Sequence, residues 1–573
     1  MAAVNIAWQV QVIPDRFLAS IAVQEAGLRQ TTRFSAGLFF CTDLVFIGNH
    51  MLIKIETALV DPANFKGEPL SINRRTLLKG AAAMAAMGAG LSAKPASAAV
   101  SQPNELGVAA AAAAIRNGEM TAESYAAGLL ARARKNADLN SFITLDEGAV
   151  LEAARSADLA RAAGKISPLL GVPFGIKDSY LTRGLKTTVG TAVLDKYIPD
   201  RDAAVVSSIR NAGAIVFGKN NLVEMSYGLT GNNTHYGQVK NPYDKTHVTG
   251  GSSSGAGASV AARIVPAALG GDTVGSIRVP ASLCGVVGFK PTPGRWPDDG
   301  IAPISGTLDT AGILARSVED CILVDSIVSR SPSSNVIARA GLKGTRIAYA
   351  PRQYLDVVDS DIEKLFLENL LKLKDAGAEI IELDLGDDFA SLTARATWTI
   401  MAREARPAIM EFIKKENISV SFDDIYQDLD PDIKGVWNSI VLPGGPGYSS
   451  DEKFSNVLKK DRPELQRRFA QMVFNRADCI IFPTTPCAAP AIANQRKFIV
   501  GSKEHPYLVL ARNTIPGSCA GLPGISLPAG LSQQGLPVGI EIDAAPGQDR
   551  NLLALAQNIE SVIGSIPVPS GLR

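Results

Sequence analysis

Short apolar runs alternate with amphipathic segments along most of this chain, and this alternation limits the possible fold more than any other feature. The runs GVPFGIK, AIVFGK, RIAYAP and DCIIFP each end at glycine, proline or a charged residue, as buried strands do. Segments with helical spacing lie between such runs, for example residues 202–213 and 361–377. This order predicts an α/β fold, in which a large mixed, mostly parallel β-sheet is covered by helices on both faces.

The charge balance and the scarce histidines limit the class of partner and the chemistry. The chain has 57 Lys and Arg against 56 Asp and Glu, a net charge of +1, so nothing favours nucleic acid or an anionic membrane as partner. Its 6 cysteines include no C-x-x-C pair, and only 4 histidines are present. We therefore expect no metal. We also expect no cofactor, and a small-molecule ligand bound by a monomer or a homodimer.

Three parts of a bacterial export signal occur in order within residues 71–98. Arg74 and Arg75 precede a weakly apolar stretch, and Ala96–Ala98 follows it as a typical cleavage site. This segment resembles a twin-arginine signal, with an alanine-rich helix after a basic turn as the alternative. It is too short to span a bilayer. We expect a periplasmic or secreted protein, cytoplasmic only if the signal is unused, with residues 99–573 as a single domain.

Residues 1–70 fit neither the export signal nor the domain that follows it. An apolar stretch in this region is interrupted by Asp43 and His50, so we do not expect a transmembrane helix. A start codon assigned too early would explain such an extension.

Lys177 ends the apolar run GVPFGIK, and this position bears on its chemistry. Burial disfavours the charged form of lysine and lowers its pKa. A shift of about 2–3 units from ~10.4 would make it a general base near neutral pH. In a chain with few histidines, such a lysine could activate a serine hydroxyl. A structural ion pair with Asp178 is the alternative.

Two runs rich in glycine and serine follow the lysine, TGGSSSGAG at 249–257 and GGDTVGSIRVPASLCGVVGFKPT at 270–292. The first contains the G-x-S-x-G pattern of α/β-hydrolases, which would make Ser253 a nucleophile and leave His505 as its base. That pattern requires a strand directly before it, whereas NPYDKTHVTG is polar and turn-like. We therefore disfavour this interpretation.

The lysine and the two runs, in this order and spacing, resemble the amidase signature family. Blocks such as AGAIVFGKNNLVEMSYG, FPTTP and AGLPGISLPAG extend the resemblance over about residues 103–565. The resemblance implies hydrolysis of a carboxylic amide to an acid and ammonia or an amine, through an acyl-enzyme. An ammonia-supplying amidotransferase subunit and a catalytically silent binding protein share the resemblance and are the alternatives.

The resemblance also implies a role for individual residues. Ser276 would be the nucleophile, Ser252, after a cis peptide bond, the bridging serine, and Lys177 the base. Backbone N–H groups would form the oxyanion hole, on which acyl transfer depends strongly; they belong to Thr273, Val274, Gly275 and Ser276. Four further residues would support the site, namely Gly250, Gly251, Ser253 and Arg278.

The sequence departs from the family pattern at two positions near the site. Gly271 stands where threonine is usual, which removes a hydroxyl near the serine relay. Val274 stands where glycine is frequent, and valine does not readily adopt a positive φ. Both departures leave Lys177 and the two serines intact.

Residues 290–317 look most like the branch of the family that acts on aryl-acid amides, the indoleacetamide and mandelamide hydrolases. We therefore expect an aryl or arylalkyl amide as substrate. An aryl acylamidase or a peptide amidase would carry the same catalytic residues and remains open. Candidate pocket residues, each of which could instead pack in the core, are Leu222, Met225, Tyr227, Trp296, Ile304 and Trp398.

Overall fold

The computed structural model describes residues 102–329 and 341–572, together with four short strands nearer the N-terminus. The chain divides into two units, Met1–Lys94 and Pro95–Arg573. The first contains two antiparallel hairpins, formed by β1 (Val23–Glu25) with β2 (Leu28–Gln30) and by β3 (Thr42–Ile47) with β4 (His50–Ile55). The export signal predicted at 71–98 and the remainder of residues 1–70 lie outside the described residues, so those interpretations stay predictions.

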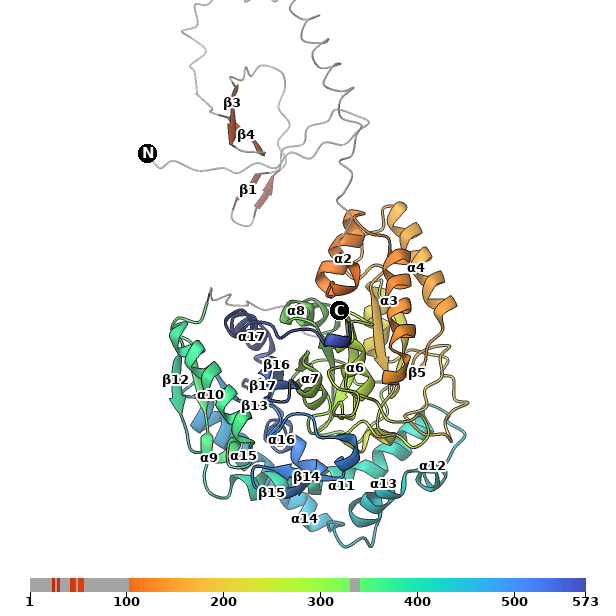
Figure 1. The fold of residues 1–573 in the computed structure, drawn as a ribbon, viewed down its shortest axis with the longest axis vertical. Helices are drawn as coiled ribbons and strands as arrows, with labels where there is room; N and C mark the ends of the chain where they lie inside the picture. Colours follow the sequence, from red (N-terminus) through yellow and green to blue (C-terminus); the bar gives the residue numbers. More distant parts are fainter. Residues whose placement is uncertain are drawn as a thin grey trace, which may run out of the picture. The chain divides into compact units, whose positions relative to one another are not determined.

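An 11-stranded sheet runs through the second unit (Figure 1). Its strands, in spatial order, are β12 (Glu379–Glu382), β11 (Arg346–Tyr349), β13 (Cys479–Pro483), β17 (Pro537–Asp543), β16 (Gly524–Leu531), β9 (Val287–Lys290), β10 (Thr310–Ala315), β8 (Ala267–Asp272), β6 (Pro173–Lys177), β7 (Ile215–Asn220) and β5 (Phe142–Thr144). Parallel pairing occurs in two groups, β12-β11-β13 and β8-β6-β7, and the strands between them pair antiparallel.

The expected α/β fold with a large mixed sheet is confirmed, with a larger antiparallel share than the alternation of strands and helices suggests. The reason lies in the connections. No helix separates β9 from β10 or β16 from β17. Neighbouring strands that are joined without a crossover pair antiparallel, whereas parallel neighbours require one.

Helices cover both faces of the sheet, as β17 shows. A Cβ added at Gly539 would lie 2.6 Å from Oγ of Ser282 in α7 (Arg278–Cys284). Because side chains alternate along a strand, Ile540 and Ile542 point to the opposite face from Gly539. Helix α17 (Asp549–Ile563) also contacts β17, and its Leu552 belongs to the same hydrophobic core as these two isoleucines.

The other long helices frame the sheet (Figure 1). Near one edge lie α2 (Val108–Asn117), α3 (Ala122–Lys135) and α4 (Glu147–Ala162), drawn in orange, and near the other lies α10 (Ser360–Asp375), drawn in green. Helices α5 (Ala204–Asn211), α6 (Ser254–Ala261) and α8 (Val318–Val328) pack between them. No described helix is both long and apolar enough to cross a membrane.

Helix boundaries follow the sequence signals closely at the start of this unit. Asn117–Gly118 marks a helix break, because α2 ends where Gly118 adopts φ +73°. The Thr121 hydroxyl then accepts a hydrogen bond from the Ser124 N–H at 3.0 Å and caps α3.

The segment 386–470 is helical and irregular. It contains α11 (Phe389–Lys415), α12 (Phe422–Asp428), α13 (Pro431–Val436), α14 (Asp451–Asn456) and α15 (Arg462–Arg468), with short π-helical turns between some of them. These helices enclose a second hydrophobic core, at the centre of which Trp437 is fully buried.

Candidate active site

Lys177 is the last residue of β6, and its buried amine lies against Ser252. The Nζ atom donates a hydrogen bond of 2.7 Å to the Ser252 Oγ, and Ser252 follows the cis peptide bond Gly251–Ser252. Burial lowers the pKa of Lys177 to about 7, although the charges of Asp309 and Asp272 oppose this shift. Near neutral pH a large fraction of Lys177 is therefore an uncharged amine, which can take a proton from Ser252.

The alternative of an ion pair between Lys177 and Asp178 is not what the structure contains. The Asp178 carboxylate lies 2.9 Å from the Nζ of Lys219, and both of those side chains are fully buried. It also accepts hydrogen bonds from the N–H and the hydroxyl of Thr188, at 2.9 and 2.6 Å. Lys219 thus compensates the charge of Asp178, and the Lys177 amine forms its hydrogen bond with Ser252 instead.

Ser276 lies in the turn that connects β8 to α7. The Ser253 N–H donates to the Ser276 carbonyl oxygen at 3.2 Å, which brings the two serine-bearing runs together. The Ser253 hydroxyl lies 3.2 and 3.3 Å from the carbonyl oxygen and the nitrogen of Gly271. Ser276 itself is 4% exposed and lines an apolar cavity. Its hydroxyl is therefore placed where a bound molecule could meet it.

The backbone of this turn is suited to binding negative charge. None of the described residues accepts a hydrogen bond from the N–H groups of residues 273–276, whereas the N–H groups of Ile277 and Arg278 donate to Asp272 at 3.1 and 3.4 Å. Buried N–H groups usually have a partner. Unpaired N–H groups gathered in one turn can stabilise the oxyanion that forms when an acyl carbonyl is attacked.

Gly275 gives the turn its shape. It adopts φ +143°, and a Cβ added there would lie 2.4 Å from the Thr514 hydroxyl oxygen. The positive φ therefore falls on Gly275, and Val274 is accommodated with its side chain in the wall of the apolar cavity. At the other departure, Gly271, an added Cβ would meet only the Lys177 Nζ, at 3.9 Å, so a threonine would fit beside the amine and the glycine leaves that space without a hydroxyl.

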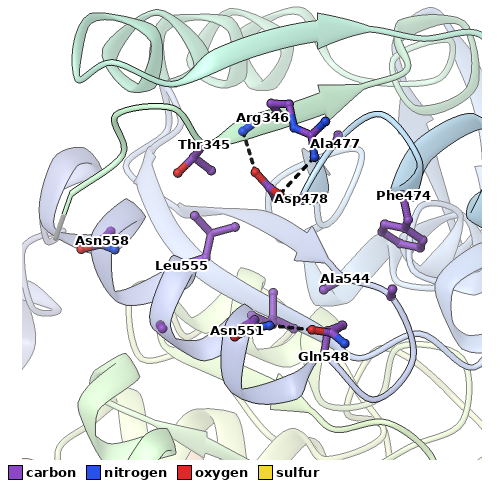
Figure 2. Close-up of a pocket in the computed structure, with 13 residues that line it drawn as sticks. Thr345, Arg346, Phe474, Ala477, Asp478, Ala544, Gln548, Asn551, Leu555 and Asn558 are labelled. Carbon is purple, nitrogen blue, oxygen red and sulfur yellow. Dashed lines mark hydrogen bonds and ion pairs between the residues drawn. The ribbon is translucent and has the colours of Figure 1, made fainter. Parts of the chain in front are cut away.

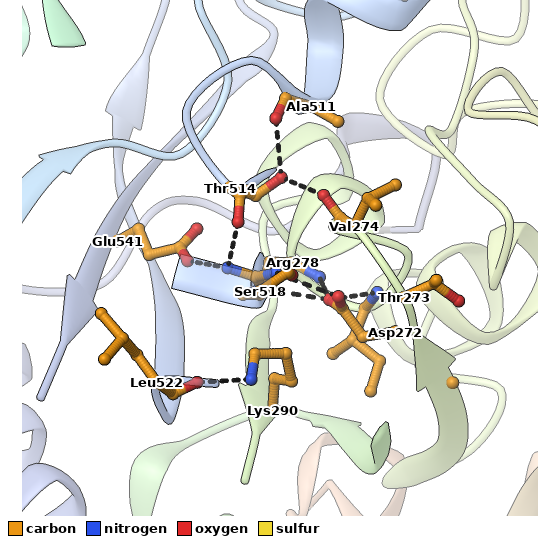
Figure 3. Close-up of polar contacts among 12 residues, drawn as sticks. Asp272, Thr273, Val274, Arg278, Lys290, Ala511, Thr514, Ser518, Leu522 and Glu541 are labelled. Atoms are coloured by element: carbon orange, nitrogen blue, oxygen red, sulfur yellow. Dashed lines mark hydrogen bonds and ion pairs between the residues drawn. The ribbon is translucent and has the colours of Figure 1, made fainter. Parts of the chain in front are cut away.

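Arg278, one of the predicted supporting residues, fixes the turn from behind (Figure 3). Its guanidinium donates to both carboxylate oxygens of Asp272 at 3.0 Å and also pairs with Glu541. It further donates to the Thr514 carbonyl oxygen at 3.2 Å and to the Ser518 hydroxyl at 2.5 Å. Burial alone would raise the pKa of Asp272, but the Arg278 charge holds it below its usual value. The turn is thus tied to α16 (Ile515–Ala520) and to β17.

An apolar cavity of about 530 Å³ lies over Ser276. Three of the predicted pocket residues line it, namely Tyr227, Ile304 and Trp398 of α11. Further wall residues, which no sequence motif marks, are Leu229, Met401, Val436, Ile440, Tyr507 and Leu508. They come from distant parts of the chain, and the helical segment 386–470 supplies one wall.

The structure places three of the predicted pocket residues elsewhere. Leu222 is fully buried and does not line the apolar cavity. Trp296 is 2% exposed, packs edge-on against Phe289, and donates from its indole N–H to Asp325 at 2.9 Å. Met225 is buried one residue before the cavity lining begins at Ser226. Trp296 and Met225 are large apolar side chains that complete the core, a role that sequence alone does not distinguish from a pocket wall.

A smaller cavity of about 100 Å³ adjoins the apolar one, since Ser226, Thr273 and Ile304 line both. Its wall also contains Lys177 and Asp309. The sequence pattern gave no reason to select Asp309.

A further cavity, of about 350 Å³, lies between β11, the start of β13 and α17 (Figure 2). In its wall the Arg346 N–H donates to Asp478 at 2.9 Å and the Asn551 amide donates to Gln548 at 2.5 Å. None of the residues selected from the sequence lines it. Lys177 and Ser276 line the two adjoining cavities instead.

Thiols and metal ligands give no competing site within the described residues. No group of three His, Cys, Asp or Glu side chains is placed there to hold a metal ion. The five cysteines of this part of the chain are free and buried. Burial raises the pKa of the Cys284 thiol, and a thiol that stays protonated is a poor nucleophile.

Comparison with known proteins agrees with the geometry. The family model "Amidase" matches residues 126–553. The chain is 38% identical over 486 residues to mandelamide hydrolase of Pseudomonas putida, covering 81% of this chain and 93% of that protein. It is 34% identical over 449 residues to an indoleacetamide hydrolase of Agrobacterium vitis, with coverages of 78% and 94%. Native peptide amidase from Stenotrophomonas maltophilia superposes with a TM-score of 0.67 at 26% identity, covering 81% of this chain and 98% of that one.

The chain belongs to the amidase family and is an enzyme that hydrolyses amides.

Proposed function

We propose that the enzyme hydrolyses aryl or arylalkyl amides through an acyl-enzyme on Ser276, with Ser252 and Lys177 as the proton relay. The observation that carries the proposal is the buried hydrogen bond of 2.7 Å between Lys177 and Ser252. An amine whose pKa lies at about 7 can serve as a general base at neutral pH, and no histidine is required.

The reaction proceeds in two halves. Uncharged Lys177 takes the proton of Ser252 as Ser252 takes that of Ser276, and the Ser276 oxygen attacks the amide carbonyl carbon. The N–H groups of residues 273–276 bind the oxyanion. The C–N bond then breaks, and the leaving amine receives the proton from Lys177 through Ser252. A water molecule, deprotonated by the same relay, attacks the ester and releases the acid and Ser276.

The apolar cavity supports an aromatic acyl group. Its volume of about 530 Å³ lies within the range of small-molecule sites, about 300–1,000 Å³. Tyr227, Trp398 and Ile304 offer apolar surface close to Ser276. Two relatives are named for mandelamide and indoleacetamide, both of which carry an aromatic ring.

A panel of amides tests this specificity. We expect kcat/KM for phenylacetamide or indoleacetamide to exceed that for acetamide at least ~10-fold, because apolar groups gain binding energy in an apolar pocket. Trp398→Ala should raise KM for the aryl amides and leave acetamide turnover near the wild-type value. A preference for acetamide would contradict the proposal. Faster cleavage of anilides or of C-terminal peptide amides would point to an aryl acylamidase or a peptide amidase.

We also propose export to the periplasm or beyond by the twin-arginine route. The proposal is supported by Arg74 and Arg75, by the cleavage pattern at Ala96–Ala98, and by a family match that begins only at residue 126. Replacing both arginines by lysine should leave the full-length protein in the cytoplasm of a bacterial host. Fractionation with immunoblotting measures this, and equal export of wild type and variant would contradict it.

A further inference from the structure

We propose that Asp309 is a positioning residue for the amidase reaction, which controls the charge state of Lys177 and ties the oxyanion turn to the substrate loop. The inference rests on the proposed function, because it assigns Lys177 as the base. Asp309 directly precedes β10, and nothing in the sequence pattern selects it.

The Asp309 carboxylate joins two parts of the site. One oxygen accepts a hydrogen bond of 2.6 Å from the Thr273 hydroxyl. The other accepts from the N–H groups of Ile304 and Ser305, at 2.7 and 2.9 Å. Thr273 belongs to the turn that supplies the oxyanion donors, and Ile304 lines the apolar cavity. Asp309 therefore fixes the distance between the reacting serine and the wall that holds the substrate.

Asp309 also faces the base. Asp309 and Lys177 line the same cavity of about 100 Å³. The two carboxylates whose charges act on Lys177 are Asp309 and Asp272. Asp272 is paired with Arg278, whereas the three hydrogen-bond donors to Asp309 are all neutral. Of the two carboxylates that act on Lys177, Asp309 is therefore the one that no cationic side chain among the described residues pairs with.

The titration of this pair follows from its surroundings. Burial raises the pKa of Asp309 to about 6, and Lys177 opposes that rise. Tyr227 also lies within reach of the Asp309 charge, but burial raises its pKa beyond the working range of pH. Above about pH 6 Asp309 is ionised and favours the ammonium form of Lys177, so its removal should lower the pKa of Lys177. Because the two groups interact, the measured values belong to the pair.

This arrangement has a catalytic use. Burial without a neighbouring carboxylate would leave Lys177 uncharged but weakly basic. A general base works best when its pKa lies near the operating pH. Asp309 keeps the amine basic enough to draw a proton through Ser252.

Asp309→Asn removes the charge and keeps the contacts. The asparagine oxygen can accept from the N–H groups of Ile304 and Ser305, while its NH₂ donates to the Thr273 oxygen. We expect the acidic limb of the kcat/KM profile to move down by about one pH unit, as loss of a nearby unit charge should produce. The thermal unfolding temperature should stay close to that of the wild type.

Glu404→Gln is the matched control. Glu404 holds the same loop by accepting from the Thr307 N–H at 2.9 Å and the Thr307 hydroxyl at 2.6 Å, but it is not among the charges that act on Lys177. This variant should leave the acidic limb in place. The inference would be overturned if folded Asp309→Asn kept the acidic limb of its kcat/KM profile at the wild-type pH. It would also be overturned if Asp309→Asn and Glu404→Gln raised KM equally and neither moved that limb.

The rate at which a fluorophosphonate labels Ser276 gives a readout that needs no amide substrate. The same downward shift of its pH profile in Asp309→Asn supports the inference, and an identical profile overturns it. If the wild type hydrolyses none of the aryl amides but the labelling profile still shifts in Asp309→Asn, the proposed substrate fails while the role of Asp309 stands.

Discussion

Lys177→Met should lower kcat for amide hydrolysis by about 10³-fold or more, because it removes the proposed general base and with it the proposed activation of Ser276. The variant should remain folded, since Lys177 is 2% exposed and an unbranched apolar side chain fits the same space without the cost of burying an amine. Steady-state kinetics with phenylacetamide and a thermal unfolding curve measure both effects.

Lys186→Met is a suitable control for this substitution. Lys186 lies at the surface, where its amine is 3.1 Å from Asp195, and its side chain has no part in the site. The control should retain wild-type turnover. More than a tenth of wild-type turnover in Lys177→Met would mean that another group activates the nucleophile.

Arg278→Met should lower the free energy of unfolding by about 3–5 kcal/mol, the usual result of removing one member of a buried ion pair. Arg278, Asp272 and Glu541 are all fully buried. Without the guanidinium, Asp272 and Glu541 would stay in the interior without their cation, and the oxyanion turn would lose its tie to α16 and β17.

Denaturant titration followed by circular dichroism measures this loss, and the folded fraction should have little activity. Arg134→Met provides the comparison, because Arg134 pairs with Glu147 at the surface, where ion pairs contribute little. Equal unfolding midpoints for the two variants would contradict the role assigned to Arg278.

The parts of the fold that were predictable are those set by local sequence. The glycine at 118 and the threonine at 121 mark a helix end and a helix start, and both signals depend only on backbone geometry and one side chain. Lys177 was identifiable because it ends a short apolar run, and the structure buries it at the end of β6. The antiparallel pairing at the centre of the sheet was harder to predict from sequence, because it depends on which strands become neighbours.

The parts that could not be predicted depend on tertiary contacts. Trp296 and Tyr227 look alike in sequence, yet Trp296 packs in the core and Tyr227 lines the cavity. Met401 and Tyr507 reach the cavity from segments with no local motif. Asp309 gains its role only where Thr273 and Lys177 lie beside it. Long-range packing, which leaves no periodic trace in sequence, decides each of these.

The central claim is that a buried, uncharged lysine takes a proton through one serine so that a second serine can attack a carbonyl. The pH dependence of fluorophosphonate labelling, with the modified residue located by peptide mass spectrometry, tests it most directly. We expect the label on Ser276, at a rate that rises as pH passes about 7, with the rise abolished in Lys177→Met. A label on Ser253 or elsewhere, or the same pH profile in Lys177→Met, would contradict the account.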